Sequence, residues 1–132
     1  MKPRPLFDSH LHIIDPRFPL VENDGYLPPP FTVSDYRART AAWPLVGGAI
    51  VSGSFQAFDQ SYLLAALRAL GERVVGVTQL PPTVSDDEVL ALAAAGVRGV
   101  RFNLRRGGSA AAADIGAMAA RFHELAGWHA EL

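Results

Sequence analysis

Strand-like and helix-like segments alternate along the whole chain of 132 residues, and this alternation limits the folds that are open to it. Apolar runs that predict strands lie at Leu6–His12, 48–52, 74–78 and 97–102, and a further strand begins at Trp128. Strands that alternate with helices are typical of βα units, whose strands pair in parallel. The sequence therefore predicts an α/β protein with a parallel sheet.

Each predicted helix has a capping residue or apolar positions at helical spacing, and a residue that ends it. The first predicted helix runs from a cap at Thr32 or Ser34 to about Ala42, and the second from a cap at Asp59 to Leu70, before Gly71. The third runs from the capping box of Ser85 and Glu88 to about Gly96, and the fourth from Ala111 to Leu125, before Gly127. Residues 15–30 contain several prolines and predict a long loop, and loops of this length are often functional.

Two architectures fit this order of elements: a doubly wound sheet and a (β/α)8 TIM barrel. No Gly-x-Gly-x-x-Gly follows the first strand, which disfavours a dinucleotide-binding Rossmann domain. We predict the TIM-barrel type, with four βα units and the start of strand five. A complete barrel needs about 250 residues. We therefore expect residues 1–132 to be the N-terminal half of a single barrel domain, as a fragment of a larger enzyme; a truncated gene or assembling half-barrels are the alternatives.

His10 and His12 lie at the end of the first predicted strand. Residues i and i+2 of a strand point to the same face, so the two imidazoles converge on one point. Such a pair suits a metal ion or an anionic substrate, although zinc usually takes three or four protein ligands. The alternative is a pair of buried, hydrogen-bonded histidines.

The amino-acid composition limits the kinds of molecule that this chain is expected to bind. The net charge is −1, which gives no nucleic-acid footprint, and no apolar run is long enough for a membrane span. Cysteine is absent, which is compatible with a cytoplasmic enzyme. Lys2 is the only lysine, so carboxylates would be held by arginine, which grips them with two parallel hydrogen bonds. We expect a small carboxylated molecule as the partner, no nucleic acid and no membrane; a homo-oligomer is compatible with these features.

Several stretches together resemble the amidohydrolase-related (amidohydrolase 2) family, in particular the branch that contains 2-pyrone-4,6-dicarboxylate lactonase. They are residues 8–20, Tyr26-Leu27-Pro28-Pro29, Asp35-Tyr36-Arg37, Ser54 with Asp59-Gln60 and Leu63-Leu64, residues 96–104, and Gly127-Trp128-His129. The resemblance covers nearly the whole chain but only the first half of the family's barrel. Ser52-Gly53 departs from the Gln-Pro that often precedes the serine in that family.

The resemblance implies a hydrolase of the metal-dependent-hydrolase type that opens a small carboxylated lactone. In such an enzyme His10 and His12 are catalytic, and a carboxylate at the end of strand eight, outside this chain, activates the attacking water. The remaining candidates would bind substrate: Arg101 and either Arg105 or Arg106 as carboxylate clamps, Ser54 as a hydrogen-bond donor, Tyr26 from the long loop, and Asn103, which either orients Arg101 or satisfies the backbone.

Three hypotheses about the function of the chain remain at this point. A lactonase of this branch is expected to need no cofactor and to use the histidines as hydrogen-bond donors. A decarboxylase of the same superfamily would instead hold one divalent metal, such as zinc, on His10 and His12. A catalytically inactive half-barrel is the third.

Overall fold

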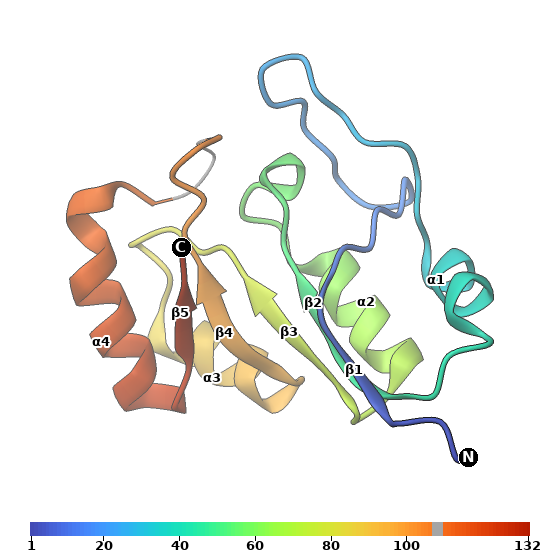
Figure 1. Cartoon of the computed structure of the whole chain (residues 1–132). Helices are drawn as coiled ribbons and strands as arrows, with labels where there is room; N and C mark the ends of the chain where they lie inside the picture. The colour runs from blue at the N-terminus through green and yellow to red at the C-terminus, as the bar shows by residue number, and fades with distance from the viewer. Residues whose placement is uncertain (107–109) are drawn as a thin grey trace.

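The computed structural model describes residues 1–106 and 110–132. Five parallel strands lie in chain order and form a sheet that curls into half of a barrel, as Figure 1 shows. They are β1 (Leu6–Leu11), β2 (Leu45–Val51), β3 (Val74–Thr78), β4 (Val97–Arg101) and β5 (His129–Glu131). The predicted α/β class and the half-barrel are therefore confirmed.

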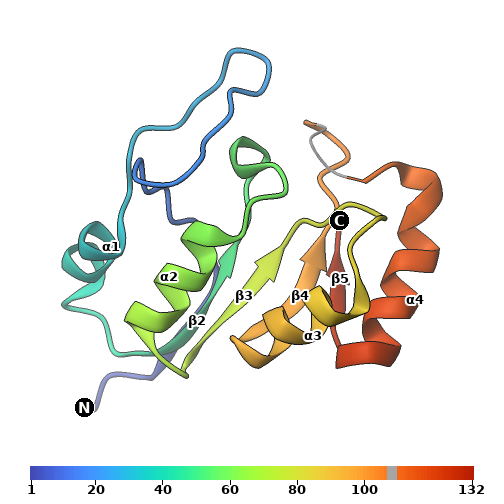
Figure 2. The same ribbon diagram turned by 180° about the vertical axis from the view of Figure 1, so that it is seen from behind.

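Helices cover the convex face of this sheet, which Figure 2 shows from behind with α2 and α3 in front of the strands. The elements are α1 (Val33–Thr40), η1 (Ser54–Gln56), α2 (Ser61–Leu70), α3 (Asp86–Ala94), η2 (Ala112–Asp114) and α4 (Ile115–Ala126). The main hydrophobic core lies between sheet and helices and includes Ile50, Leu63, Val100 and Phe122, each at most 1% exposed. Within the described residues, no helix has both the length and the apolar character that a membrane span requires.

Capping boxes begin two of the helices. Thr32, rather than Ser34, is the N-cap of α1, and its side chain accepts a hydrogen bond from the Asp35 N–H while Asp35 bonds back. Ser85 and Glu88 form the same reciprocal pair before α3, as predicted. Each box satisfies two of the N–H groups that a helix start leaves unpaired.

The predicted cap at Asp59 is wrong by one residue. Gln60 is the N-cap of α2 and makes no side-chain capping bond, because its backbone is already close to helical. Asp59 still accepts hydrogen bonds from the main-chain N–H and the hydroxyl of Ser61. The aspartate thus satisfies a helix-start donor from one position further out than the capping pattern places it.

The long loop between β1 and α1 is fixed at its base. Ile14 and Phe31 exchange main-chain hydrogen bonds at 2.8 Å, and the nearly buried carboxylate of Asp15 pairs with Arg17 at 2.7 Å. This pairing with Arg17 holds the pKa of Asp15 below its usual range. In Figure 1 the loop rises above the carboxyl ends of the strands, on the same edge as η1 and the segment after β4.

Gly47 lies where β2 approaches the start of β3 too closely for a side chain. A Cβ atom at this position would stand 2.4 Å from the Arg73 carbonyl oxygen and 3.0 Å from the Phe7 ring. The main-chain oxygen cannot move aside without disturbing the sheet. The glycine is therefore required by the close packing of backbone against backbone.

We expect Gly47→Ala to lower the free energy of unfolding by about 1–3 kcal/mol, the usual cost of overpacking. Urea denaturation followed by circular dichroism measures this change. Gly116→Ala is the matched control, because nothing lies within 4 Å of a Cβ there and alanine favours the helix. Equal stability of the two variants would contradict the packing explanation.

Candidate active site

The predicted site residues gather at the carboxyl ends of the strands. His10 lies in β1, His12 follows one residue after its end, and Arg101 is the last residue of β4. Because strands in a parallel sheet all end at one edge, residues from distant parts of the chain meet there (Figure 1). The sequence predicted β1 to include His12, but the strand ends at Leu11.

The two histidines face each other as the i, i+2 spacing predicts. Their ring centroids are 4.9 Å apart and the rings stand nearly perpendicular, at 87°. The ring of Phe55 in η1 lies 6.0 Å from that of His12. His12 Nδ1 donates a hydrogen bond to the Val51 carbonyl at 2.7 Å. Since a carbonyl oxygen only accepts, the proton is on Nδ1 and neutral His12 presents Nε2 as a lone pair.

The surroundings of His12 favour this neutral form. Burial lowers the pKa of His12 below the ordinary 6.5, and the hydrogen bond to Val51 opposes that effect in part. The positive charges of His10 and Arg101 lower the pKa further. At neutral pH the Nε2 atom therefore has a free lone pair, which can bind a metal ion or accept a hydrogen bond from a water molecule.

Arg101 reaches from β4 across β3 to the end of β2. Its Nη1 donates a hydrogen bond to the Ser52 carbonyl at 2.8 Å. Glu131 lies opposite Arg101 in the β4–β5 register, but its carboxylate bonds His129 at 2.9 Å. Within the part of the chain that the structure describes, Arg101 forms no ion pair. A cation that is held in place without a protein counter-charge is suited to an anionic ligand.

Arg105 and Arg106 extend this positive region. Together with Arg101, Asn103, Leu104 and Leu132, they line a hollow of about 320 Å³. The Asn103 carboxamide accepts a hydrogen bond from the Arg106 N–H at 3.2 Å, so in this structure it satisfies the backbone rather than orienting Arg101. The Arg106 guanidinium lies 5.1 Å from the centroid of the Tyr26 ring, which brings the tip of the long loop to this hollow.

Ser54 begins η1 and is buried, at 4% exposure. Its segment is fixed by two buried amides: Gln56 bonds the Gly53 N–H and the Ile13 carbonyl, and Gln79 Nε2 donates to the Gly53 carbonyl at 3.0 Å. The segment ends at Ala57, whose φ of +47° is strained for a residue with a side chain. The structure thus holds Ser54 in a rigid segment next to the histidines.

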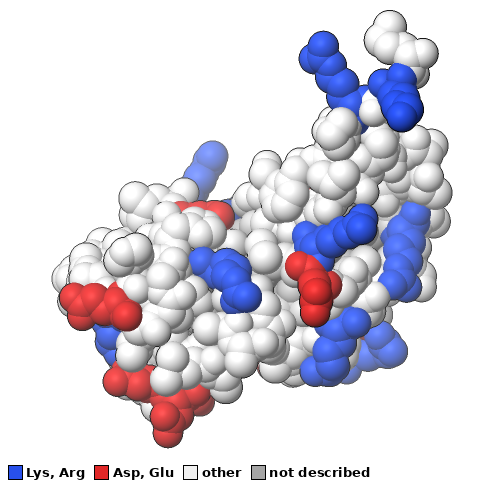
Figure 3. All heavy atoms as spheres, turned by 90° about the horizontal axis from the view of Figure 1, so that it is seen from below, with Lys and Arg blue, Asp and Glu red and all other residues white. Residues whose placement is uncertain are grey.

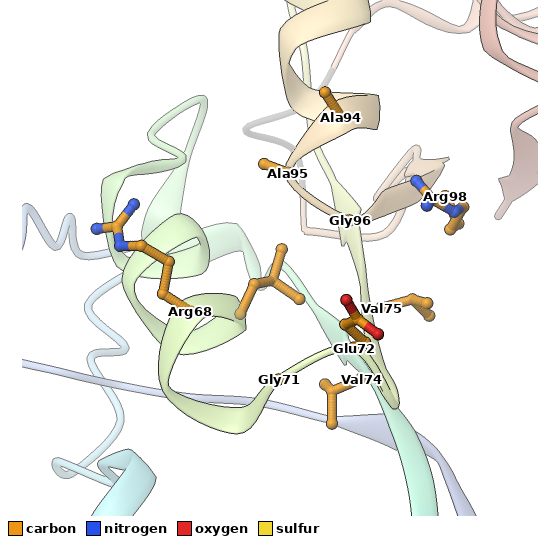
Figure 4. A pocket seen from close by; sticks show the side chains of 10 residues that line it. Arg68, Gly71, Glu72, Val74, Val75, Ala94, Ala95, Gly96 and Arg98 are labelled. Carbon is orange, nitrogen blue, oxygen red and sulfur yellow. The ribbon is translucent and has the colours of Figure 1, made fainter.

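The other two histidines lie away from this site. His123 in α4 contacts the Trp128 carbonyl through Nδ1 at 3.3 Å, and His129 stands at the start of β5, near the amino ends of the strands. A hollow of about 550 Å³ between α2 and α3 also lies at those amino ends, lined by residues that include Arg68, Glu72 and Arg98 (Figure 4). Figure 3 views the chain from this side and shows basic and acidic side chains scattered over it, some of them side by side. The two histidines and this hollow therefore lie outside the candidate site.

The positions that sequence reasoning missed act mainly through their backbone. The carbonyls of Val51 and Ser52 hold His12 and Arg101, and a main-chain oxygen leaves no signal in the sequence. Gln79 was detectable in principle, because a polar residue directly follows the apolar strand Val74–Thr78.

Comparison with known proteins shows the family to which the chain belongs. The sequence profile described as Amidohydrolase matches residues 7–130, which is nearly the whole chain. The chain belongs to the amidohydrolase family. The matched range contains every predicted site residue, and the predicted family resemblance is confirmed.

Two curated relatives are enzymes that are named for small carboxylated or sulfonated ring compounds. The 4-sulfomuconolactone hydrolase of Rhizobium radiobacter is 29% identical over 98% of this chain and 43% of its own length. The 2-pyrone-4,6-dicarboxylate hydrolase of Comamonas testosteroni is 29% identical over 73% of this chain and 32% of its own length. The chain thus spans less than half the length of these relatives.

Solved structures agree on the fold. An apo crystal structure from Agrobacterium tumefaciens superimposes with a TM-score of 0.83 at 25% identity, over 97% of this chain and 47% of the other. A probable 2-pyrone-4,6-dicarboxylic acid hydrolase from Acinetobacter baumannii, crystallised with citric acid, gives 0.78 at 23% identity, over 94% and 47% of the two chains. The half-barrel of this amidohydrolase chain therefore corresponds to about half of a larger chain in each case.

We expect His12 to titrate below pH 6.5 and to carry its neutral proton on Nδ1, which imidazole ¹⁵N chemical shifts measure directly. Because its pKa is lower in the folded than in the unfolded chain, protonation favours unfolding. The free energy of unfolding should therefore fall as the pH drops from about 6.5 through the folded-state pKa, and level off below it.

The control for this titration is His12→Asn, whose carboxamide keeps a donor for the Val51 carbonyl but has no proton to gain. This variant should lose the part of the pH dependence that comes from His12. An unchanged pH profile of stability in the variant would show that His12 is not the destabilising group.

Proposed function

We propose that this chain is part of a hydrolase that opens a small carboxylated lactone by attack of an activated water. The observation that carries the proposal is Arg101, a cation without a protein counter-charge among the described residues, held beside His12 by the Ser52 carbonyl. Arg105 and Arg106 line the adjoining hollow and offer a second clamp. The names of the two curated hydrolases support the same class of substrate.

The chain's own residues would bind and polarise the substrate. Arg101 would grip one carboxylate and so orient the ring. Tyr26 would contact the substrate from the long loop beside Arg106, and Ser54 would donate a hydrogen bond to it from η1. The lactone carbonyl would then lie at the histidine pair, where negative charge develops on its oxygen as water attacks. His12 Nε2 donates to that oxygen only when the ring is protonated, because Nδ1 is already bonded to Val51.

The orientation of His12 also supports the second candidate, a metal-dependent enzyme of the same superfamily such as a decarboxylase. A neutral imidazole whose Nδ1–H bonds a carbonyl is the form in which histidine binds metals through Nε2. His10 and His12 would supply two ligands, and the described residues contain no group of three or more metal-binding side chains. A bound divalent ion would polarise the substrate carbonyl as a Lewis acid. The remaining ligands would have to come from outside the described residues.

We also propose a cytoplasmic location and a small molecule as the main partner, without nucleic acid or membrane. The absence of cysteine and the net charge of −1 support these proposals. Self-association into a homo-oligomer is compatible with the same features. An inactive half-barrel stays the alternative to an enzyme, and the kinetic experiment below distinguishes the two.

In the whole enzyme we expect Arg101→Ala to raise the KM for a dicarboxylated lactone by at least about tenfold, because a charge-assisted hydrogen bond contributes about 1.5–3 kcal/mol. Ring opening is followed by ultraviolet absorbance. Arg37→Ala is the control, since Arg37 bonds the Ala69 carbonyl at 2.5 Å, away from the site. An unchanged kcat/KM in Arg101→Ala would remove Arg101 from the site, and no turnover by the unmodified protein would support a catalytically inactive chain.

Dialysis against a chelator separates the two catalytic candidates. We expect lactone hydrolysis to survive the treatment, and kcat/KM to rise as the pH falls through the pKa of His12, because the metal-free route uses protonated His12 as a donor. A metal enzyme would behave in the opposite way: activity would disappear, return on addition of zinc, and fall at low pH as protons displace the metal from His12.

A further inference from the structure

Ser52 follows β2 by one residue and is held on three sides. Its N–H donates to the Val77 carbonyl at 2.9 Å, its hydroxyl lies 2.6 Å from the Tyr62 hydroxyl, and its carbonyl accepts from Arg101 at 2.8 Å. The three bonds lead to β3, to α2 and to the candidate site. Any movement of the Ser52 peptide therefore moves the point at which the Arg101 guanidinium is anchored.

The Ser52–Tyr62 contact is a buried polar pair inside an apolar core. Ser52 is fully buried and Tyr62 is 2% exposed, among residues such as Leu63 and Ile50. Burial raises the pKa of Tyr62, so its hydroxyl stays protonated. A hydroxyl pair in such surroundings holds its geometry firmly, because water is not there to replace a lost partner.

We propose that Ser52 and Tyr62 are positioning residues that fix Arg101 for carboxylate binding, and that they thereby help to select carboxylated substrates. This inference rests on the proposed role of Arg101 as a clamp. It goes beyond that role because Tyr62 is in the first turn of α2, on the helix side of the sheet, and acts on the site only through Ser52.

The test is a set of variants of the whole enzyme. Tyr62→Phe and Ser52→Ala each remove the hydroxyl pair, and Ser52→Thr keeps a hydroxyl at the same place. Two quantities are measured for every variant: kcat and KM for a dicarboxylated lactone, and the Kd for citrate by calorimetry, which needs no turnover. Citrate is used as the probe because it carries three carboxylates.

We expect Tyr62→Phe and Ser52→Ala to raise KM and the citrate Kd about three- to tenfold, the effect of one hydrogen bond, with kcat within about twofold. Ser52→Thr should restore part of the affinity. In an Arg101→Ala background the same substitutions should have no further effect on either quantity, because the group they position is gone. Tyr36→Phe is the matched control, since it removes a tyrosine hydroxyl that donates to Asp8 at 3.1 Å rather than to Ser52; its KM should be unchanged.

Two outcomes would overturn the inference. One is a loss of thermal stability in Tyr62→Phe with KM and Kd unchanged, which would make the pair purely structural. The other is an equal rise of KM with and without Arg101. If Tyr62→Phe does not fold, Ser52→Ala in the two backgrounds decides the question. If Arg101→Ala itself changes neither quantity, the clamp in the proposed function fails first, and the role of Ser52 and Tyr62 fails with it.

Discussion

Two consecutive carbonyl groups at the end of β2 determine the arrangement of this site. The Val51 oxygen accepts from His12 on the β1 side, and the Ser52 oxygen accepts from Arg101 on the β4 side. Successive carbonyls of a strand point in opposite directions, so one short segment holds residues from both of its flanks. The histidine and the arginine are therefore placed relative to each other by a rigid piece of backbone rather than by their own contacts.

This arrangement also determines the electrostatics. Burial of the imidazole lowers the pKa of His12, and the nearby charges of His10 and Arg101 lower it further, so His12 stays neutral and Nε2 is left as an acceptor. Among the described residues the Arg101 side chain has no ion pair, and Glu131, the carboxylate opposite it, bonds His129. Beside the Nε2 acceptor, Arg101 is thus a cation without an ion pair among the described residues, and such a cation is suited to hold an anionic group.

Much of the fold was predictable because its signals are local. The capping box of Ser85 and Glu88 and the terminating Gly127 appear at the predicted positions, since each depends on a few neighbouring residues. The cap at Asp59 was wrong because Gln60 already has a near-helical backbone. The predicted helix from Ala111 starts four residues later as an α-helix, at Ile115, after a 3₁₀ turn at Ala112–Asp114. Alanine-rich sequence alone does not distinguish the two kinds of turn.

The sequence by itself determined the parallel α/β class, the convergence of His10 and His12 and the position of Arg101 at a strand end, because periodicity places side chains on faces and parallel strands end together. Only the tertiary structure decided which atoms those side chains contact. The hydroxyl pair of Ser52 and Tyr62 joins the end of β2 to α2. The bonds from His12 to the Val51 carbonyl and from Arg101 to the Ser52 carbonyl join residues that are distant in sequence. Such contacts depend on the curvature of the sheet and on main-chain oxygens, and neither is encoded by the identity of any single residue.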